Sequence, residues 1–196
     1  VQAALAEDIG GTAVAGDLTD PATDAKILKA IGRGGLAGLV NNAGIFRRLG
    51  FADSDERDWR DQFELNLFAA VRVTKSLLPK LKAHGAGSIV NISSTAGARA
   101  VAGMSAYSAT KAALNNWTQT LALELAPDIR VNAISPGLVD TPLHSFTTKQ
   151  KNDLKTAQPL GRIGQPEDIA TAALFLFESA WITGVILPVD GGISLT

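Results

Sequence analysis

The stretch Leu36-Ala37-Gly38-Leu39-Val40-Asn41-Asn42-Ala43-Gly44 decides the fold of this protein. Residues 36–40 are apolar or glycine throughout, which is typical of a parallel strand buried on both faces. Residues 41–44 are small or turn-forming, so the chain can leave the strand through a tight loop. The stretch therefore predicts a buried strand that ends at a loop able to approach a ligand.

The same alternation of apolar strands and amphipathic helices continues on both sides of this stretch. Further strands are predicted at residues 12–16, 88–93, 129–134 and 185–189. Helices are predicted at residues 21–31, 55–81, 105–126, 147–156 and 166–177. This order predicts an α/β protein with right-handed crossovers, in which helices cover both faces of a doubly wound parallel sheet. Ligands bind at the carboxyl ends of the strands in such sheets.

The longest predicted helix carries its own start signal and an apolar stripe. Asp53 and Glu56 stand at the spacing of a capping box. Apolar residues then recur at helical spacing at Trp59, Phe63, Leu67, Ala70, Leu77 and Leu81. The pattern predicts that this stripe packs on the sheet or on another helix.

The composition bounds the class of protein. With 196 residues, 46% hydrophobic and 19% charged, the chain fits one domain over residues 1–196. The net charge of −1 gives no positive field for nucleic acid or a membrane surface. With no cysteine and two histidines, we expect no metal site. No apolar run approaches the ~18 residues of a membrane span, and the first residues lack a signal-peptide pattern, so we expect a cytoplasmic protein.

The segment Tyr107-Ser108-Ala109-Thr110-Lys111 is the strongest candidate for chemistry. On a helix, residues four apart are offset by about 40° and ~6 Å, which places Tyr107 and Lys111 on one face. An ammonium ~5 Å from a phenol favours the phenolate by about 3 kcal/mol, so we expect Lys111 to lower the pKa of Tyr107. Taken alone, the same spacing describes an ordinary pair of residues on a helix surface.

Special residues also follow three of the predicted strands. Ser94 comes just after the strand at 88–93, the Asn41–Gly44 loop follows the strand at 36–40, and Pro136-Gly137 follows the strand at 129–134. Each has a structural explanation as a turn or cap. Because carboxyl ends of parallel strands share one edge of the sheet, however, the three segments should lie at one crevice.

Together these features resemble the short-chain dehydrogenase/reductase family over essentially the whole chain. The matching residues are Asp17-Leu18, Asn41-Asn42-Ala43-Gly44, Asn66, Ser94, Tyr107, Lys111, Pro136-Gly137-Leu138-Val139-Asp140-Thr141 and Val189-Asp190-Gly191-Gly192. The resemblance implies a Rossmann-like fold. It also implies an oxidoreductase that uses NAD or NADP on a secondary alcohol or ketone, with 3-oxoacyl-carrier-protein reductases among the similar activities.

The resemblance implies four catalytic residues. Tyr107 would exchange a proton with the substrate oxygen, and Ser94 would hydrogen-bond the same oxygen. Lys111 would bind the nicotinamide ribose and lower the pKa of Tyr107. Asn66 would help to hold a water that relays protons from Lys111, although an amide in a helix can equally be a satisfied core group.

The cofactor-binding residues follow from the same resemblance. Asp17 and Leu18 would lie at the adenine edge, although Asp17 can also be only a turn acid. The remaining residues would be Asn41, Ala43 and Gly44 on the adenosine side, Tyr107 and Lys111 at the ribose, and Pro136, Gly137, Val139 and Thr141 at the nicotinamide end.

The family pattern begins with segments that the chain does not contain. These are a strand, a Thr-Gly-x-x-x-Gly-x-Gly loop, a helix and a second strand, so the predicted sheet lacks its first two strands. The chain also has no initiator Met and opens in an Ala-rich helical pattern, so we expect a longer natural protein. The alternative is a noncatalytic fragment or pseudoenzyme that acts through protein interaction.

The expected partners are a small-molecule substrate and further copies of the chain. By the resemblance, helices 55–81 and 105–126 and the end at 185–196 form the interfaces of a homo-oligomer, a tetramer. An apolar stripe can also serve intramolecular packing. Arg47 and Arg48 could favour an anionic substrate, but solvated loop charges are the preferred interpretation.

Overall fold

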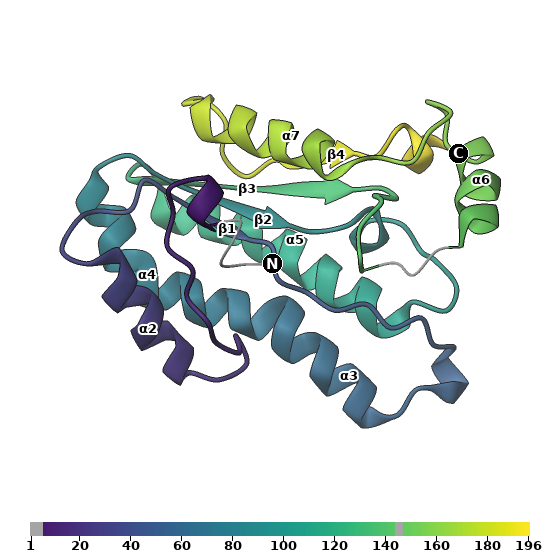
Figure 1. Cartoon of the computed structure of the whole chain (residues 1–196), viewed down its shortest axis with the longest axis horizontal. Helices are drawn as coiled ribbons and strands as arrows, with labels where there is room; N and C mark the ends of the chain where they lie inside the picture. The colour runs from purple at the N-terminus through teal and green to yellow at the C-terminus, as the bar shows by residue number, and fades with distance from the viewer. Residues whose placement is uncertain (1–5, 144–146) are drawn as a thin grey trace.

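A computed structural model describes residues 6–143 and 147–196 of the protein. Four strands form one parallel sheet in the order β1-β2-β3-β4 (Figure 1). They are β1 Gly38–Asn41, β2 Gly87–Ile92, β3 Ile129–Pro136 and β4 Ile186–Val189. Leu39 pairs with Ile89 and Ile89 with Val131, which fixes the register of the central strands. The predicted α/β class and parallel sheet are confirmed.

Helices occupy the positions that the sequence predicts, with small shifts at their ends. They are α2 Ala22–Ile31, α3 Glu56–Phe63, the π-helical turn η2 Glu64–Phe68, α4 Ala69–His84, α5 Ser105–Leu125, α6 Thr148–Thr156 and α7 Pro166–Glu178. Short 3-10 turns lie at η1 Phe51–Asp53, η3 Thr95–Gly97 and η4 Ile193–Leu195. Among the described residues, no helix is long and apolar enough to cross a membrane.

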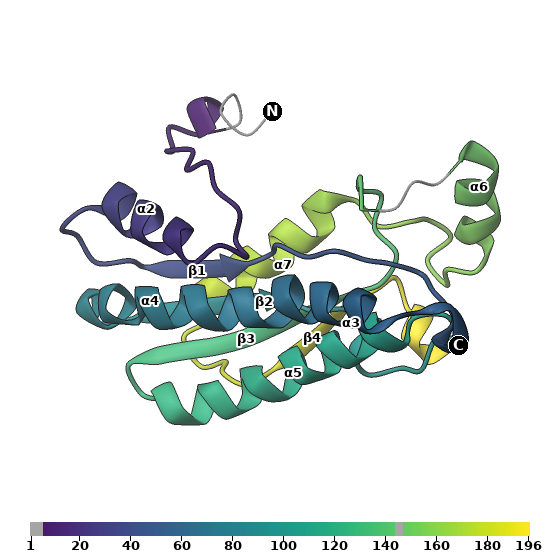
Figure 2. The same cartoon turned by 90° about the horizontal axis from the view of Figure 1, so that it is seen from below.

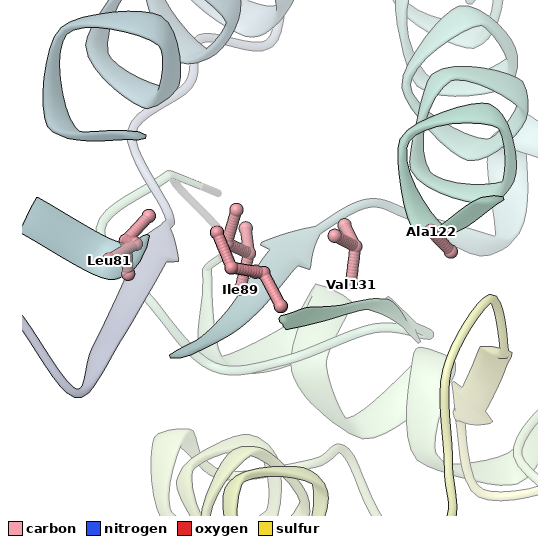
Figure 3. Close-up of a cluster of buried hydrophobic side chains, with 5 residues drawn as sticks. Leu81, Ile89, Ala122 and Val131 are labelled. Carbon is pink, nitrogen blue, oxygen red and sulfur yellow. The ribbon is translucent and has the colours of Figure 1, made fainter. Parts of the chain in front are cut away.

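The sheet separates two hydrophobic cores. On one face, Ile89 and Val131 pack with Leu81 of α4 and Ala122 of α5 (Figure 3). On the other face, Val90 and Ile134 pack with Leu176 of α7. Neighbouring residues of a strand point to opposite faces, so one continuous apolar strand such as β2 supplies both cores. Figures 1 and 2 show α7 on one side of the sheet and α4 and α5 on the other.

The connection from β3 to β4 departs from the predicted handedness. The chain moves across the sheet in one direction from β1 to β4, yet α4 and α5 lie on one face and α7 on the other. The last crossover therefore has the opposite hand to the first two, and the prediction that all are right-handed is wrong. The long excursion over residues 137–165 frees α7 to cover the second apolar face, which α4 and α5 leave open.

Residues 12–16 do not form the predicted strand. The structure leaves them irregular and largely exposed, outside the sheet. Two alanines and a glycine in five residues have low strand propensity and bury little apolar surface, which explains the error. In the Ala-rich start of the chain, residues 6–8 are helical and residues 1–5 lie outside the described residues.

The start of the long helix also differs from the prediction. Asp55, not Asp53, caps α3: its side chain accepts from the Asp58 N–H at 2.9 Å, and Asp58 accepts from the Asp55 N–H at 3.2 Å. Leu77 and Leu81 are buried as predicted, but the half-helix before them buries Gln62 and Asn66 instead of the aromatic residues of the stripe. These amides satisfy loop backbone groups that would otherwise lack partners.

Candidate active site

The carboxyl ends of the four strands bring the predicted segments to one edge of the sheet. The loop after Asn41, the Ser93–Ser94 segment, Gly137 and Asp190 each follow a strand directly. All four strands are parallel, so these segments share that edge. The edge is where open α/β sheets bind ligands.

Tyr107 and Lys111 lie in the first two turns of α5 and are both buried, with 9% and 4% of their surface exposed. The Lys111 ammonium lies over the tyrosine ring, 5.7 Å from its centroid. Lys111 Nζ donates to the Ile92 carbonyl at 2.9 Å, which ties α5 to the end of β2. The structure thus brings the predicted pair together at the edge of the sheet.

The proton affinity of Tyr107 differs from the sequence-based expectation. Burial raises the pKa of Tyr107, and its hydrogen bond with the Ser94 side chain only partly opposes this effect. Burial also lowers the pKa of Lys111 to about 8. The predicted net lowering of the Tyr107 pKa is therefore not found. Desolvation of the phenol is the largest effect on this pKa and outweighs the hydrogen bond that favours the phenolate.

Ser94 has two partners at the end of β2. Its hydroxyl interacts with Tyr107, and it accepts a hydrogen bond from the Ala96 N–H at 3.2 Å. The second bond makes Ser94 the cap of η3. The cap fixes the hydroxyl beside the phenol, so the capping role of Ser94 is compatible with its predicted catalytic role.

Asn66 joins the loop after β1 to α5. Its Oδ1 accepts from the Ile45 N–H at 2.7 Å, and its Nδ2 donates to the Ile45 carbonyl at 3.0 Å and to Thr110 Oγ1 at 3.2 Å. A Cβ on Gly44 would lie 3.0 Å from Asn66 Oδ1 and 3.7 Å from Lys111 Nζ, so glycine permits this approach. The side chain of Asn66 is thus a satisfied core amide that sets the loop beside Lys111.

The other residues of the β1 loop divide into buried and exposed groups. The Asn41 side chain donates to Thr74 Oγ1 at 3.0 Å and to Asn91 Oδ1 at 2.8 Å, so it points into the protein. Asn42 and Ala43 are exposed beyond the strand end. Of the residues predicted on the adenosine side, Asn41 can therefore offer a ligand only its backbone, and Ala43 can offer its exposed surface.

Asp17 and Leu18 lie before α2, apart from the Tyr107 cluster. Asp17 Oδ1 accepts from the Thr19 N–H and hydroxyl, each at 2.8 Å, and these bonds hold the pKa of Asp17 below its usual range. The Leu18 carbonyl accepts from the Arg72 guanidinium of α4. Asp17 is therefore the turn acid that the structural interpretation describes, and its exposure leaves it open to a ligand.

Pro136, Gly137, Val139 and Thr141 form a further group at the end of β3. A Cβ on Gly137 would lie 2.8 Å from the backbone of Asp190, so only glycine lets these two strand ends approach. Val139 pairs with Gly164 in an isolated parallel bridge. Asp140 forms an ion pair with Lys151 of α6 at 2.7 Å. Thr141 is half-buried.

Sequence reasoning missed three residues at the site. Thr110 is fully buried and donates to the Tyr107 carbonyl at 2.7 Å, and its place inside the Tyr-Lys segment was the available signal. The Phe46 ring meets the Tyr107 ring, and no local pattern indicates this contact. Arg47 remains a loop charge with 40% of its side chain exposed, like the exposed Arg48, but it also pairs with Asp58 and Asp61, both at 2.9 Å, which the sequence did not indicate.

Comparisons with known proteins identify the relatives of this chain. A sequence model of the Enoyl-(Acyl carrier protein) reductase family matches residues 1–194. The 3-oxoacyl-[acyl-carrier-protein] reductase FabG of Thermotoga maritima is 38% identical over 172 residues, 86% of this chain and 69% of the relative. The 2,5-dichloro-2,5-cyclohexadiene-1,4-diol dehydrogenase LinX of Sphingobium indicum is 41% identical over 166 residues, 83% of this chain and 66% of the relative.

A solved structure has a similar fold. Ligand-free aldohexose dehydrogenase of Thermoplasma acidophilum matches 92% of this chain and 77% of its own, with a TM-score of 0.85 and 34% identity. The chain spans about two thirds of the length of the curated relatives that it matches. Its sequence, its fold and its buried Tyr107–Lys111 pair agree, and the chain belongs to the short-chain dehydrogenase/reductase family of oxidoreductases.

Proposed function

We propose that the protein transfers a hydride between NAD or NADP and a secondary alcohol or ketone. The observation that carries this proposal is the cluster of Ser94, Tyr107 and Lys111 at the carboxyl edge of the sheet. A hydroxyl, a phenol and an ammonium within one buried cluster suit proton exchange with a carbonyl or alcohol oxygen. The turn and cap explanations do not account for the burial of the lysine.

The residues present fit a nicotinamide cofactor. An ammonium has three donors, and Ile92 accepts from one of them, which leaves donors for ribose hydroxyls. Gly44 presents no side chain beside Lys111, so a ligand can approach closely. Asp17, Leu18, Asn41 and the Pro136–Thr141 segment would hold the remaining parts of the cofactor. The bound nicotinamide would supply or accept the hydride.

The chain's own residues would manage the proton. Burial keeps Tyr107 protonated at neutral pH, which suits a donor to the substrate oxygen during reduction. Ser94, fixed by its bond from Ala96, would orient the same oxygen. Lys111 would hold the ribose and, with a pKa of about 8, could return a proton toward Tyr107. Asn66 would fix the loop beside Lys111. It would also help to hold a water that relays protons from Lys111.

The names of the relatives guide the choice of substrates. One acts on a 3-oxoacyl-[acyl-carrier-protein], one on a cyclic diol and one on an aldohexose. All three carry a carbonyl or a carbinol carbon. We propose a secondary alcohol or ketone of this kind, with 3-oxoacyl thioesters as the first candidates, and a cytoplasmic location.

A homo-oligomer is the second part of the proposal. Trp59 and Phe63 stack with centroids 6.4 Å apart, and Phe68 is 52% exposed beside them. They line a surface hollow of about 460 Å³ on α3 and η2. Exposed aromatic groups of this size are typical of protein interfaces. Leu174, Phe175 and Trp181 are also exposed and, although they precede the predicted interface segment 185–196, they offer further apolar surface to the copies of a tetramer.

Binding of NADH and NADPH to the purified protein tests the proposal, with quenching of the three tryptophans as the signal. We expect one of the two to bind and to be oxidised in the presence of a 3-oxoacyl thioester or a cyclic ketone. Tyr107→Phe should retain binding and lose turnover. Absence of both binding and turnover would contradict the proposal and favour the noncatalytic alternative.

A further inference from the structure

The loop after β1 is tied to the α3–η2 helix on both sides of Phe46. Before it, Ile45 exchanges two hydrogen bonds with the Asn66 side chain, at 2.7 and 3.0 Å. After it, the Arg47 N–H donates to Gln62 Oε1 at 3.4 Å. The Arg47 guanidinium also pairs with Asp58 and Asp61, each at 2.9 Å. Phe46 therefore sits on a backbone segment that is fixed at both ends.

The fixed segment directs the Phe46 ring onto Tyr107. The two ring centroids are 5.0 Å apart and the ring planes meet at 75°, an edge-to-face contact. Such pairs are worth about 0.5–1.5 kcal/mol beyond the burial of their surface. Phe46 cannot leave Tyr107 without movement of a loop that Asn66 and Arg47 both hold.

We infer that Phe46 and Arg47 are positioning residues for Tyr107: Phe46 covers the phenol ring against water, and Arg47 anchors the loop that holds Phe46 in place. Other groups at the phenol are Ser94 at its hydroxyl and Lys111 over its ring. The charge of Arg47 is directed to Asp58 and Asp61. The catalytic role of this contact rests on the proposed function, whereas the contact between the Phe46 and Tyr107 rings is independent of it.

The cover has a chemical consequence. Burial is the main cause of the raised pKa of Tyr107, and an aromatic ring against the phenol contributes to that burial. Removal of the Phe46 ring admits water to the phenol and stabilises the phenolate. Tyr107 should then ionise and react more readily at a given pH.

The sequence makes Tyr107 directly observable, because the chain has one tyrosine and no cysteine. Tetranitromethane nitrates tyrosine through its phenolate, and peptide mass spectrometry locates the product. At mildly alkaline pH we expect Phe46→Ala to be nitrated severalfold faster than wild type, and Arg47→Met to be faster by a smaller factor. Arg60→Met is the matched control. Arg60 forms an exposed ion pair with Glu56 on α3, the helix that also carries Asp58 and Asp61, so this variant should leave the nitration rate unchanged.

A Phe46→Ala protein that is folded, by circular dichroism, and nitrated at the wild-type rate would overturn the inference. An equal acceleration in Arg60→Met would overturn the role of Arg47. If Phe46→Ala does not fold, Phe46→Val keeps a smaller apolar side chain that covers less of the phenol, so it should still accelerate nitration. A wild-type rate in that variant would equally contradict the inference.

The pH dependence of turnover separates positioning from a general structural role. In reduction the protonated phenol is the donor, so Phe46→Ala should move the alkaline loss of kcat to lower pH. A merely structural role would reduce kcat equally at every pH. Nitration needs no cofactor, so faster nitration in a protein without turnover would support the cover and contradict the proposed function. Turnover by the wild type, together with a wild-type nitration rate in Phe46→Ala, would support the proposed function and contradict the cover.

Discussion

Burial shifts the pKa values of Tyr107 and Lys111 in opposite directions. Burial disfavours the charged form of each, so the pKa of Tyr107 rises and the pKa of Lys111 falls to about 8. Tyr107 thus remains a proton donor at neutral pH, and Lys111 titrates near the physiological range. Both effects arise because η3 and the β1 loop pack over the first turns of α5.

The first prediction concerns the phenol. Tyr107→Phe removes the transferable proton and retains the ring that packs against Phe46. General acid catalysis contributes about 10²–10⁴-fold, so we expect kcat to fall by this factor with cofactor affinity unchanged. Ser108→Ala, which removes a hydroxyl from the next position of α5, is the control and should retain turnover. Near-normal kcat in Tyr107→Phe would reject the assigned donor.

The second prediction concerns Lys111 and pH. The side chain has a pKa of about 8 in the folded protein and 10.5 as its ordinary value. Between these values the unfolded chain binds a proton that the folded chain has lost, so this lysine makes the free energy of unfolding rise with pH. Below pH 8 both states are protonated and the slope disappears.

Comparison with Lys111→Met isolates this effect. The free energy of unfolding of wild type should rise relative to the variant by up to about 3 kcal/mol across the window, in urea titrations at a series of pH values. Lys82→Met, at an exposed position of α4, should follow wild type. Parallel pH curves for wild type and Lys111→Met would contradict the prediction.

At the level of elements, Arg130 connects β3 to the C-terminal end of α7. Its guanidinium donates to the carbonyls of Leu176 at 2.7 Å, Phe177 at 2.8 Å and Ile182 at 3.3 Å. The last carbonyls of a helix have no partner within the helix. A cation at this end also interacts favourably with the helix dipole. One side chain thus holds α7, which covers the second face of the sheet.

The third prediction tests this connection. Arg130→Met keeps an aliphatic side chain but removes all three bonds, so we expect a loss of about 2 kcal/mol in the free energy of unfolding. The midpoint of urea unfolding measures it. Arg60→Met removes only the exposed pair with Glu56 and should cost less than about 0.5 kcal/mol. An equal cost for the two variants would show that the carbonyls find other partners.

For the whole molecule, the exposed aromatic surface of α3 and η2 is the feature that intramolecular packing does not explain. Trp59 and Phe63 are half-buried and stack on one another, Phe68 beside them is 52% exposed, and Gln62 and Asn66 of the same segment are buried. Burial of this surface against a second copy would stabilise an oligomer.

The fourth prediction follows from this surface. Phe68→Glu places a charge in the proposed interface and should reduce the molar mass in light scattering by at least half at micromolar concentration. Ile9→Glu alters another exposed apolar residue outside both proposed interfaces and should not change the mass. A monomeric wild type, or an unchanged mass for Phe68→Glu, would contradict the proposed interface.

The sequence by itself determined the parallel sheet, the positions of α4, α5 and α7, and the Ser94, Tyr107 and Lys111 cluster. These features depend on local apolar periodicity and on short motifs at strand ends, both of which are written in consecutive residues. The capping residue of α3 was missed by two positions, because several acids in this segment satisfy the same local pattern.

Only the tertiary structure decided which face of the sheet α7 covers, where Phe46 lies and how Tyr107 titrates. The hand of the last crossover depends on which apolar face α4 and α5 leave open, and no local pattern records it. The pKa of Tyr107 depends on its burial and on its hydrogen bond with Ser94, and Ser94 and the neighbouring Phe46 are distant from it in sequence. Helix spacing gave the right pair but the wrong direction, because a Coulomb estimate for two side chains omits the burial that packing imposes on both.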